Sequence, residues 1–150
     1  MYKKSTVHFI TKICVDVLFY VGIACCLLVP FSSNWLVRYF NFQGKTTTPM
    51  IIVLLLSGVA SVYILYQLKT IFKTLLVGNP FIDANVTCLR KIAVSSFLIS
   101  IIYIFKCLFS FTISTLVIIA IFIIASLFCL TLKDLFKQAI NYKEENDLTV

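Results

Sequence analysis

The sequence predicts an all-α membrane protein, in which four transmembrane helices form an up-down bundle with amphipathic cytoplasmic helical extensions. The first reason is composition, because 61% of the 150 residues are hydrophobic and only 13% are charged. The mean hydropathy is +1.03, whereas soluble domains contain only about 45 to 50% apolar residues. The length of the apolar runs and the asymmetry of the flanking positive charges are the second and third reasons.

Four apolar runs are long enough, or nearly so, to cross hydrocarbon about 30 Å thick, which takes about 20 helical residues. Within a single domain covering residues 1–150, the predicted spans are residues 13–30, 49–67, 92–111 and 112–132. Length separates the last two, since one helix over both would extend about 60 Å. The expected turn between them is the polar cluster Ser110, Thr112, Ser114 and Thr115.

The positive charges orient the spans, since Lys and Arg in short flanks stay on the cytoplasmic side. With both termini inside, ten cations are cytoplasmic: Lys3, Lys4, Lys12, Lys69, Lys73, Arg90, Lys91, Lys133, Lys137 and Lys143. Three remain outside: Arg38, Lys45 and Lys106. The net charge of +7 therefore indicates topology and contact with anionic lipid head groups, and it does not indicate direct nucleic-acid binding.

Residues 67–91, between the second and third spans, are predicted to form a cytoplasmic helix-turn-helix hairpin. Gly78 suits the left-handed position that follows a helix, Asn79 can cap the next helix, and Pro80 fits its first turn. Arg90 and Lys91 then lie at the membrane boundary, where long cationic side chains reach the head groups.

Residues 133–150 are predicted to be a cytoplasmic C-terminal helix and tail. Its apolar stripe consists of Leu132, Leu135, Phe136, Ala139 and Ile140. Three amphipathic extensions thus emerge on one side, and their apolar stripes must be covered. They pack together, lie on the bilayer surface or receive a partner, and these alternatives stay open. The acidic tail is either a solvated end, a segment folded back on Arg90 and Lys91, or an extended ligand.

Two passages, "GNPFIDANVTCLRKIA" and "LKDLFKQAINYKEENDLTV", together with the four-span layout, resemble the bacterial membrane family catalogued as domain of unknown function 2975. The resemblance covers essentially the whole chain. It implies a multi-pass protein of the bacterial cell membrane, in a family without an established activity. It also implies a gene neighbourhood that often includes a small helix-turn-helix transcription regulator.

The function that we expect is therefore regulatory and non-enzymatic, through binding of a cytoplasmic protein partner such as that regulator. The residues expected to bind it are Asn79, Pro80, Phe81, Asn85, Leu89, Arg90, Leu135, Phe136, Glu145, Asn146, Asp147 and Leu148. The alternative is immunity or protection against a membrane-active peptide through the outer loop, by Trp35, Arg38 and Tyr39. Those aromatic residues also suit a simple belt at the membrane interface.

Asp16 is the single acid within a predicted span, and a carboxylate inside the membrane is a candidate functional residue. Lys12, one turn earlier, offers an interfacial i, i+4 partner that explains it without function. Lys106 lies near the outer face, where its side chain can reach water.

The sequence shows no catalytic constellation, metal-binding spacing or phosphate-binding glycine loop, so no enzyme, cofactor or metal is expected. The six cysteines suit small buried hydrophobes better than redox chemistry. Transport would require a homo-oligomer, and that state stays open.

Overall fold

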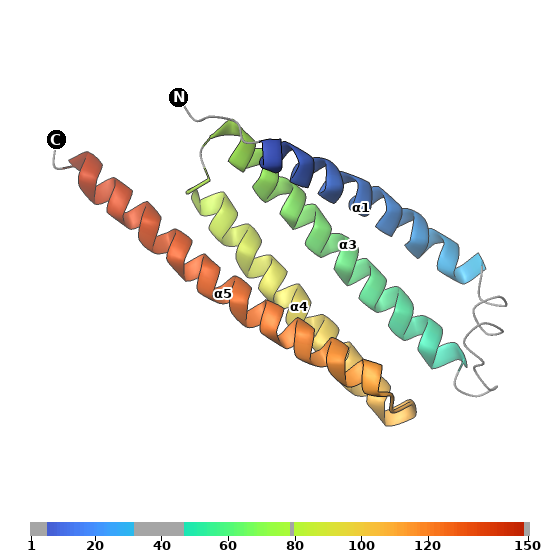
Figure 1. Ribbon diagram of the computed structural model, residues 1–150. Coiled ribbons are helices and arrows are strands. Elements are labelled where there is room, and N and C mark those ends of the chain that lie inside the picture. Colours follow the sequence, from blue (N-terminus) through green and yellow to red (C-terminus); the bar gives the residue numbers. More distant parts are fainter. Residues whose placement is uncertain (1–5, 32–46, 79, 149–150) are drawn as a thin grey trace.

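The protein consists of long helices, as the sequence predicts. A computed structural model describes residues 6–31, 47–78 and 80–148 (Figure 1). The helices are α1 (Thr6–Phe31), α3 (Thr47–Val77), α4 (Asp83–Phe109) and α5 (Ile113–Leu148). Each is long and apolar enough to cross a membrane, and these ranges contain no strand. The expected all-α, four-helix membrane architecture is confirmed, while the membrane boundaries along each helix stay predictions.

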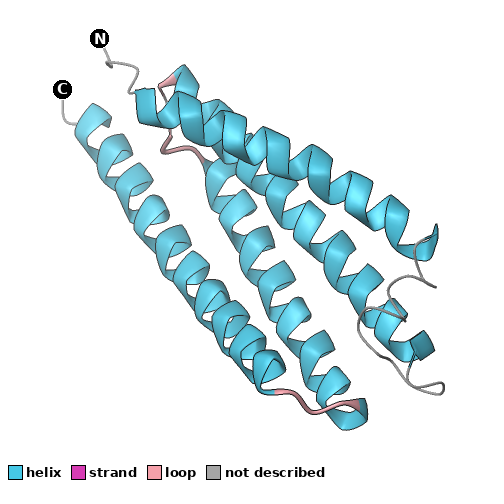
Figure 2. Cartoon of the chain, turned by 45° about the vertical axis from the view of Figure 1, so that its right-hand side comes forward, coloured by secondary structure: helices cyan, strands magenta, loops and turns pink. Residues whose placement is uncertain are grey.

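The helices pack in chain order, because the closely packed pairs are α1 with α3, α3 with α4, and α4 with α5. They alternate in direction and form a row with α1 and α5 at its two edges (Figures 1 and 2). The start of α1, the α3–α4 connection and the end of α5 lie at one end of this row. An up-down arrangement therefore brings the three predicted extensions to the same end of the molecule.

The break between α4 and α5 falls at the expected polar cluster. Ser110 is extended, with φ −153° and ψ 101°, and its backbone N–H donates to the carbonyl of Lys106. The N–H of Thr115 donates to the carbonyl of Thr112 at 2.9 Å. Ser114 and Thr115 already belong to α5, so the turn is confined to Ser110–Thr112.

The helices differ in length, which decides how far each one projects. The 36 residues of α5 extend about 54 Å, and the 27 residues of α4 about 40 Å, at 1.5 Å per residue. Hydrocarbon is about 30 Å thick. Helix α5 is therefore longer than the hydrocarbon is thick, and it is nine residues longer than α4.

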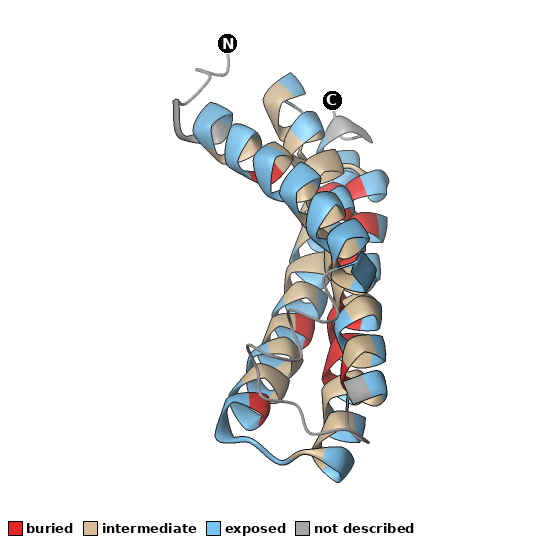
Figure 3. Ribbon diagram, turned by 90° about the vertical axis from the view of Figure 1, so that its right-hand side faces the viewer, coloured by how far each residue is buried: buried red, intermediate tan, exposed pale blue. Residues whose placement is uncertain are grey.

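Buried side chains gather where the helices meet, while the outer faces are exposed (Figure 3). One of the two inner helices of the row, α4, buries Cys88, Leu89, Ile92, Ala93 and Ile99. Its contact with α5 is also polar, since the Ser126 hydroxyl donates to the Ala93 carbonyl at 2.9 Å. Small residues let helix backbones approach closely in membranes, which accounts for this contact at Ala93.

Small residues also bring α1 against α3. A Cβ added at Gly58 would lie 2.9 Å from Sγ of Cys26, and one at Gly22 would lie 3.1 Å from Cγ2 of Val62. The two helices therefore approach most closely where glycine removes a side chain, as in other membrane helix pairs.

Candidate functional site

The α3–α4 connection ends one helix with glycine and begins the next later than the sequence suggests. Gly78 has φ +89° and its N–H donates to the carbonyl of Leu75 at 3.2 Å. Only glycine adopts this left-handed conformation without strain, so the predicted role of Gly78 is confirmed. Asn79 lies outside the described residues.

The predicted place of Pro80 in the first turn of α4 is wrong, because α4 begins at Asp83 and Ile82 is its N-cap. The reason is the side chain of Asn85, which is fully buried. Its amide donates to the Pro80 carbonyl at 2.6 Å, and its Oδ1 accepts from the Thr74 hydroxyl at 2.9 Å. These bonds hold Pro80 and Phe81 in an extended loop against α3.

The C-terminal half of α5 packs on this loop. The rings of Phe81 and Phe136 lie 5.2 Å apart, a distance at which aromatic pairs attract. One turn further along α5, Ile140 is only 8% exposed. We call the loop and hairpin residues 74–89 together with Phe136 and Ile140 the hairpin module.

The expected partner-binding residues thus divide into buried and exposed groups. Asn85 and Leu89 are buried and hold the hairpin module together. Arg90 is exposed, Phe81 is 45% exposed and Leu135 is 54% exposed. Leu135 and Phe136 do not share one surface, because neighbouring residues on a helix differ in direction by about 100°.

The acidic tail is helical as far as Leu148. Glu145 and Asn146 are exposed on α5, and Asp147 and Leu148 form its last residues. Good helix formers such as Lys143 to Glu145 continue the helix to Leu148, whereas Thr149 and Val150, on which the extended-ligand alternative also rests, lie outside the described residues. The outer-loop residues Trp35, Arg38 and Tyr39 lie outside the described residues.

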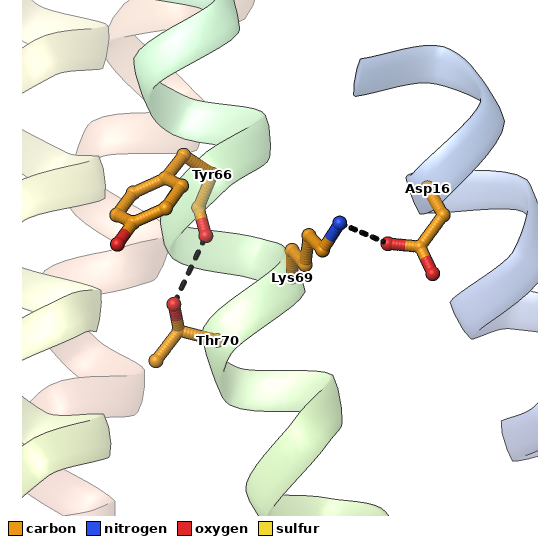
Figure 4. A network of polar contacts seen from close by, with 4 residues as sticks. All are labelled: Asp16, Tyr66, Lys69 and Thr70. Carbon is orange, nitrogen blue, oxygen red and sulfur yellow. Dashed lines mark hydrogen bonds and ion pairs between the residues drawn. The ribbon is translucent and has the colours of Figure 1, made fainter. Parts of the chain in front are cut away.

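An ion pair that was not predicted joins α1 and α3. Nζ of Lys69 lies 3.0 Å from Oδ1 of Asp16, and both side chains are about a third exposed (Figure 4). Nζ also lies 5.0 Å from the centroid of the Tyr20 ring and 5.3 Å from that of Phe19, within cation–π range. The preferred pairing of Asp16 with Lys12 is therefore wrong.

A signal for this pair was present in the sequence. Asp16 follows the start of the first predicted span by three residues, and Lys69 follows the end of the second by two. Antiparallel spans bring these positions to the same face of the membrane, about 7.5 Å apart in depth by the predicted bounds, which long side chains can bridge. Pairing across helices at similar depth was a better guide than the i, i+4 spacing.

Lys106 also has a partner that the sequence analysis did not name. Its Nζ donates to Oγ1 of Thr115 at 2.8 Å and lies 5.9 Å from the Tyr103 ring centroid. The bond joins the last turn of α4 to the start of α5, so Lys106 fixes the turn between them. All six cysteines are free, and the described residues contain no cluster of three or more potential metal ligands.

All four helices fall wholly or mostly within the part of the chain that matches a known family. A family model described as "Protein of unknown function (DUF2975)" matches residues 13–150. No curated protein and no solved structure matches the chain.

Proposed function

Since the chain belongs to the DUF2975 family, for which no activity is described, we propose from its own geometry a non-enzymatic regulatory function. The protein binds a cytoplasmic protein partner at the hairpin module and the adjoining end of α5. The ten-to-three bias of Lys and Arg supports an orientation with this end and both termini in the cytoplasm.

The proposal rests on one observation: the charged end of the molecule exposes apolar side chains. Val77 is 80% exposed, Leu135 is 54% exposed and Tyr142 is 70% exposed. The neighbours of the latter two along α5 include Lys133, Lys137 and Lys143, which favour an aqueous position. Apolar side chains held in water at one end of a protein often mark a docking surface.

The partner that suits this surface is a small helical protein. An exposed α5 with Leu135 and Tyr142 spaced by seven residues presents one apolar stripe, the pattern by which helices bind helices or grooves. The family resemblance implies that a small helix-turn-helix transcription regulator is often encoded by a neighbouring gene. Holding such a regulator at the membrane keeps it from DNA, which would make the membrane protein a regulator without catalysis.

The experiment separates docking from packing by two adjacent substitutions. Leu135→Ser removes an exposed side chain, whereas Phe136→Ser removes one that packs on Phe81. Crosslinking in cells, followed by extraction in mild detergent and mass spectrometry, identifies proteins captured by each variant. We expect Leu135→Ser and Tyr142→Ser to lose one cytoplasmic protein at unchanged membrane levels.

A matched control is Leu127→Ser, which removes an exposed leucine from the apolar part of α5. Capture that is equal in Leu135→Ser and wild type would end the docking proposal. Loss of function on replacing Trp35, Arg38 and Tyr39 by Ala, without any partner at α5, would favour peptide protection at the outer loop instead.

A further inference from the structure

A hollow of about 310 Å³ lies between α3 and α4, below the hairpin. Its lining consists of Tyr63, Thr87, Arg90, Lys91, Val94 and Ser95. The surface inside the hollow is mostly apolar, and its lining residues also carry two cationic groups and three hydroxyl groups. The residues around the hollow therefore include groups that can bind an anion next to a surface that can contact hydrocarbon.

The depth of the hollow matches a membrane interface. Arg90 lies seven residues after the start of α4, about 10 Å along the helix. Lys69, in the ion pair with Asp16, lies eight residues before the end of α3, about 12 Å from the same end. Arg90 and Lys91 thus share the level at which charged residues give way to the apolar parts of α3 and α4.

The charges in the hollow are not compensated within the described part of the chain. The ion pairs of Asp16 with Lys69 and of Lys133 with Asp134 use other cations, and no acid among the described residues is paired with Arg90 or Lys91. No acid lines the hollow. Two adjacent exposed cations without an acidic neighbour attract an anion, and arginine suits the oxygens of a phosphate group.

The apolar side chains of the lining favour the phosphate of a lipid over a free phosphate. Val94 is 60% exposed and follows Arg90 by one helical turn toward the apolar part of α4, and Tyr63 faces it from α3. A free phosphate would leave these side chains uncovered. A phospholipid has its phosphate at the membrane surface and its acyl chains deeper. In the hollow the cations lie toward the surface and Val94 lies deeper, so the two arrangements match.

We propose that this hollow binds one anionic glycerophospholipid from the inner leaflet. Arg90 and Lys91 bind the phosphate, the hydroxyls of Thr87 and Ser95 hydrogen-bond its oxygens or the glycerol, and an acyl chain runs past Val94 and Tyr63. This site depends on insertion into the membrane and not on the proposed protein partner. Partner binding and lipid binding can therefore fail separately.

The test is native mass spectrometry of the full chain in detergent, titrated with phosphatidylglycerol or phosphatidylcholine. The double variant R90Q/K91Q should weaken phosphatidylglycerol binding about thirtyfold, since each cation near anionic lipid contributes about a factor of five to affinity. The variant V94D, which puts an acid into the hollow and keeps both cations, should weaken it similarly. Phosphatidylcholine binding should change less than threefold in every variant.

The matched control is K137Q/K143Q, which removes the same charge from exposed positions of α5 outside the hollow. Equal weakening in this control and in R90Q/K91Q would mean unspecific attraction and would overturn the proposal. Full competition by millimolar inorganic phosphate would assign the hollow to a free anion, and displacement by an acidic peptide but not by lipid would assign it to a protein segment. Protection of the buried Cys88 from maleimide reports that each variant is folded.

Discussion

Helices α4 and α1 are both apolar enough to cross a membrane, but the protein holds them by different means. In the most apolar window of α4, 28% of the residues are buried, compared with 6% in that of α1. The contacts of α4 include buried Asn85 and the Ser126–Ala93 hydrogen bond. The contacts of α1 with α3 include two close approaches of the helices, at Gly22 and Gly58, and one partly exposed ion pair. Helix α4 is thus held by packing, whereas α1, at one edge of the row, is held by a few local contacts.

This difference indicates that α1 can separate from α3 while the α4–α5 pair stays folded. Apolar burial drives little association between helices in lipid, so packing and hydrogen bonds decide which helix pairs are stable. Substitutions at α4 should therefore lower the stability of the whole fold, and those at α1 should mainly release the edge helix.

The largest effect is expected for Asn85→Leu, which should lower the free energy of unfolding by about 3 kcal/mol. It removes two hydrogen bonds and leaves the Pro80 carbonyl without its amide partner, and each such loss costs about 1 to 2 kcal/mol. Reversible unfolding in SDS mixed micelles, followed by far-UV circular dichroism, measures it. Asn141→Leu, at an exposed position of α5, should change stability by less than about 0.5 kcal/mol. Equal effects would remove Asn85 from its role in the hairpin.

Gly58→Ala should weaken the α1–α3 contact by about 1.5 kcal/mol, because the new methyl group would lie 2.9 Å from Sγ of Cys26. Hydrogen exchange should rise in α1 and stay unchanged in α4. Adding Cys26→Ala removes the obstructing sulfur and should restore most of the protection. A double variant no better than Gly58→Ala alone would show that this close approach does not hold α1.

Asp16→Asn should weaken the α1–α3 contact only slightly, since partly exposed ion pairs contribute little. In a chain whose sole cysteine is Cys26, maleimide labelling should become a few times faster. Labelling of a chain whose sole cysteine is the buried Cys88 should not change. Lys12→Gln is the matched control and should have no effect on Cys26. Faster labelling in Lys12→Gln than in Asp16→Asn would favour the i, i+4 pair instead.

Ser126→Ala should have the smallest effect, about 0.6 kcal/mol, which is typical of a hydrogen bond between membrane helices. The same unfolding assay measures it, with Ser114→Ala at an exposed position of α5 as the control. A loss above 2 kcal/mol would mean that α4 and α5 depend on this single bond more than on their packing.

The sequence was sufficient for features that composition, length and local chemistry decide. Four apolar runs, a turn within the cluster from Ser110 to Thr115 and a left-handed Gly78 follow from such rules, and the structure agrees, with the turn shortened to Ser110–Thr112. The start of α4 could not be predicted in this way. It depends on Asn85 bonding Thr74 across the hairpin, a contact that local capping rules do not include.

The candidate site was predicted less completely, because its residues were chosen by sequence neighbourhood. Leu135 and Phe136 are adjacent in the chain but lie on different faces, one exposed and one packed on Phe81. Asp16 and Lys69 are far apart in the chain but lie near the same end of antiparallel helices and form an ion pair. Direction around a helix and depth across the bilayer are the two coordinates that decide such contacts.

Because α5 is long, a small rotation of this helix would move its C-terminal end by several ångströms. The helix bonds α4 at Ser126, and its last residue lies 22 positions further, about 33 Å away along a straight helix. Rotation of α5 by about 10° around that point would move its end by about 6 Å. The Phe81–Phe136 contact lies between Ser126 and that end, so such a rotation would first have to separate α5 from the hairpin.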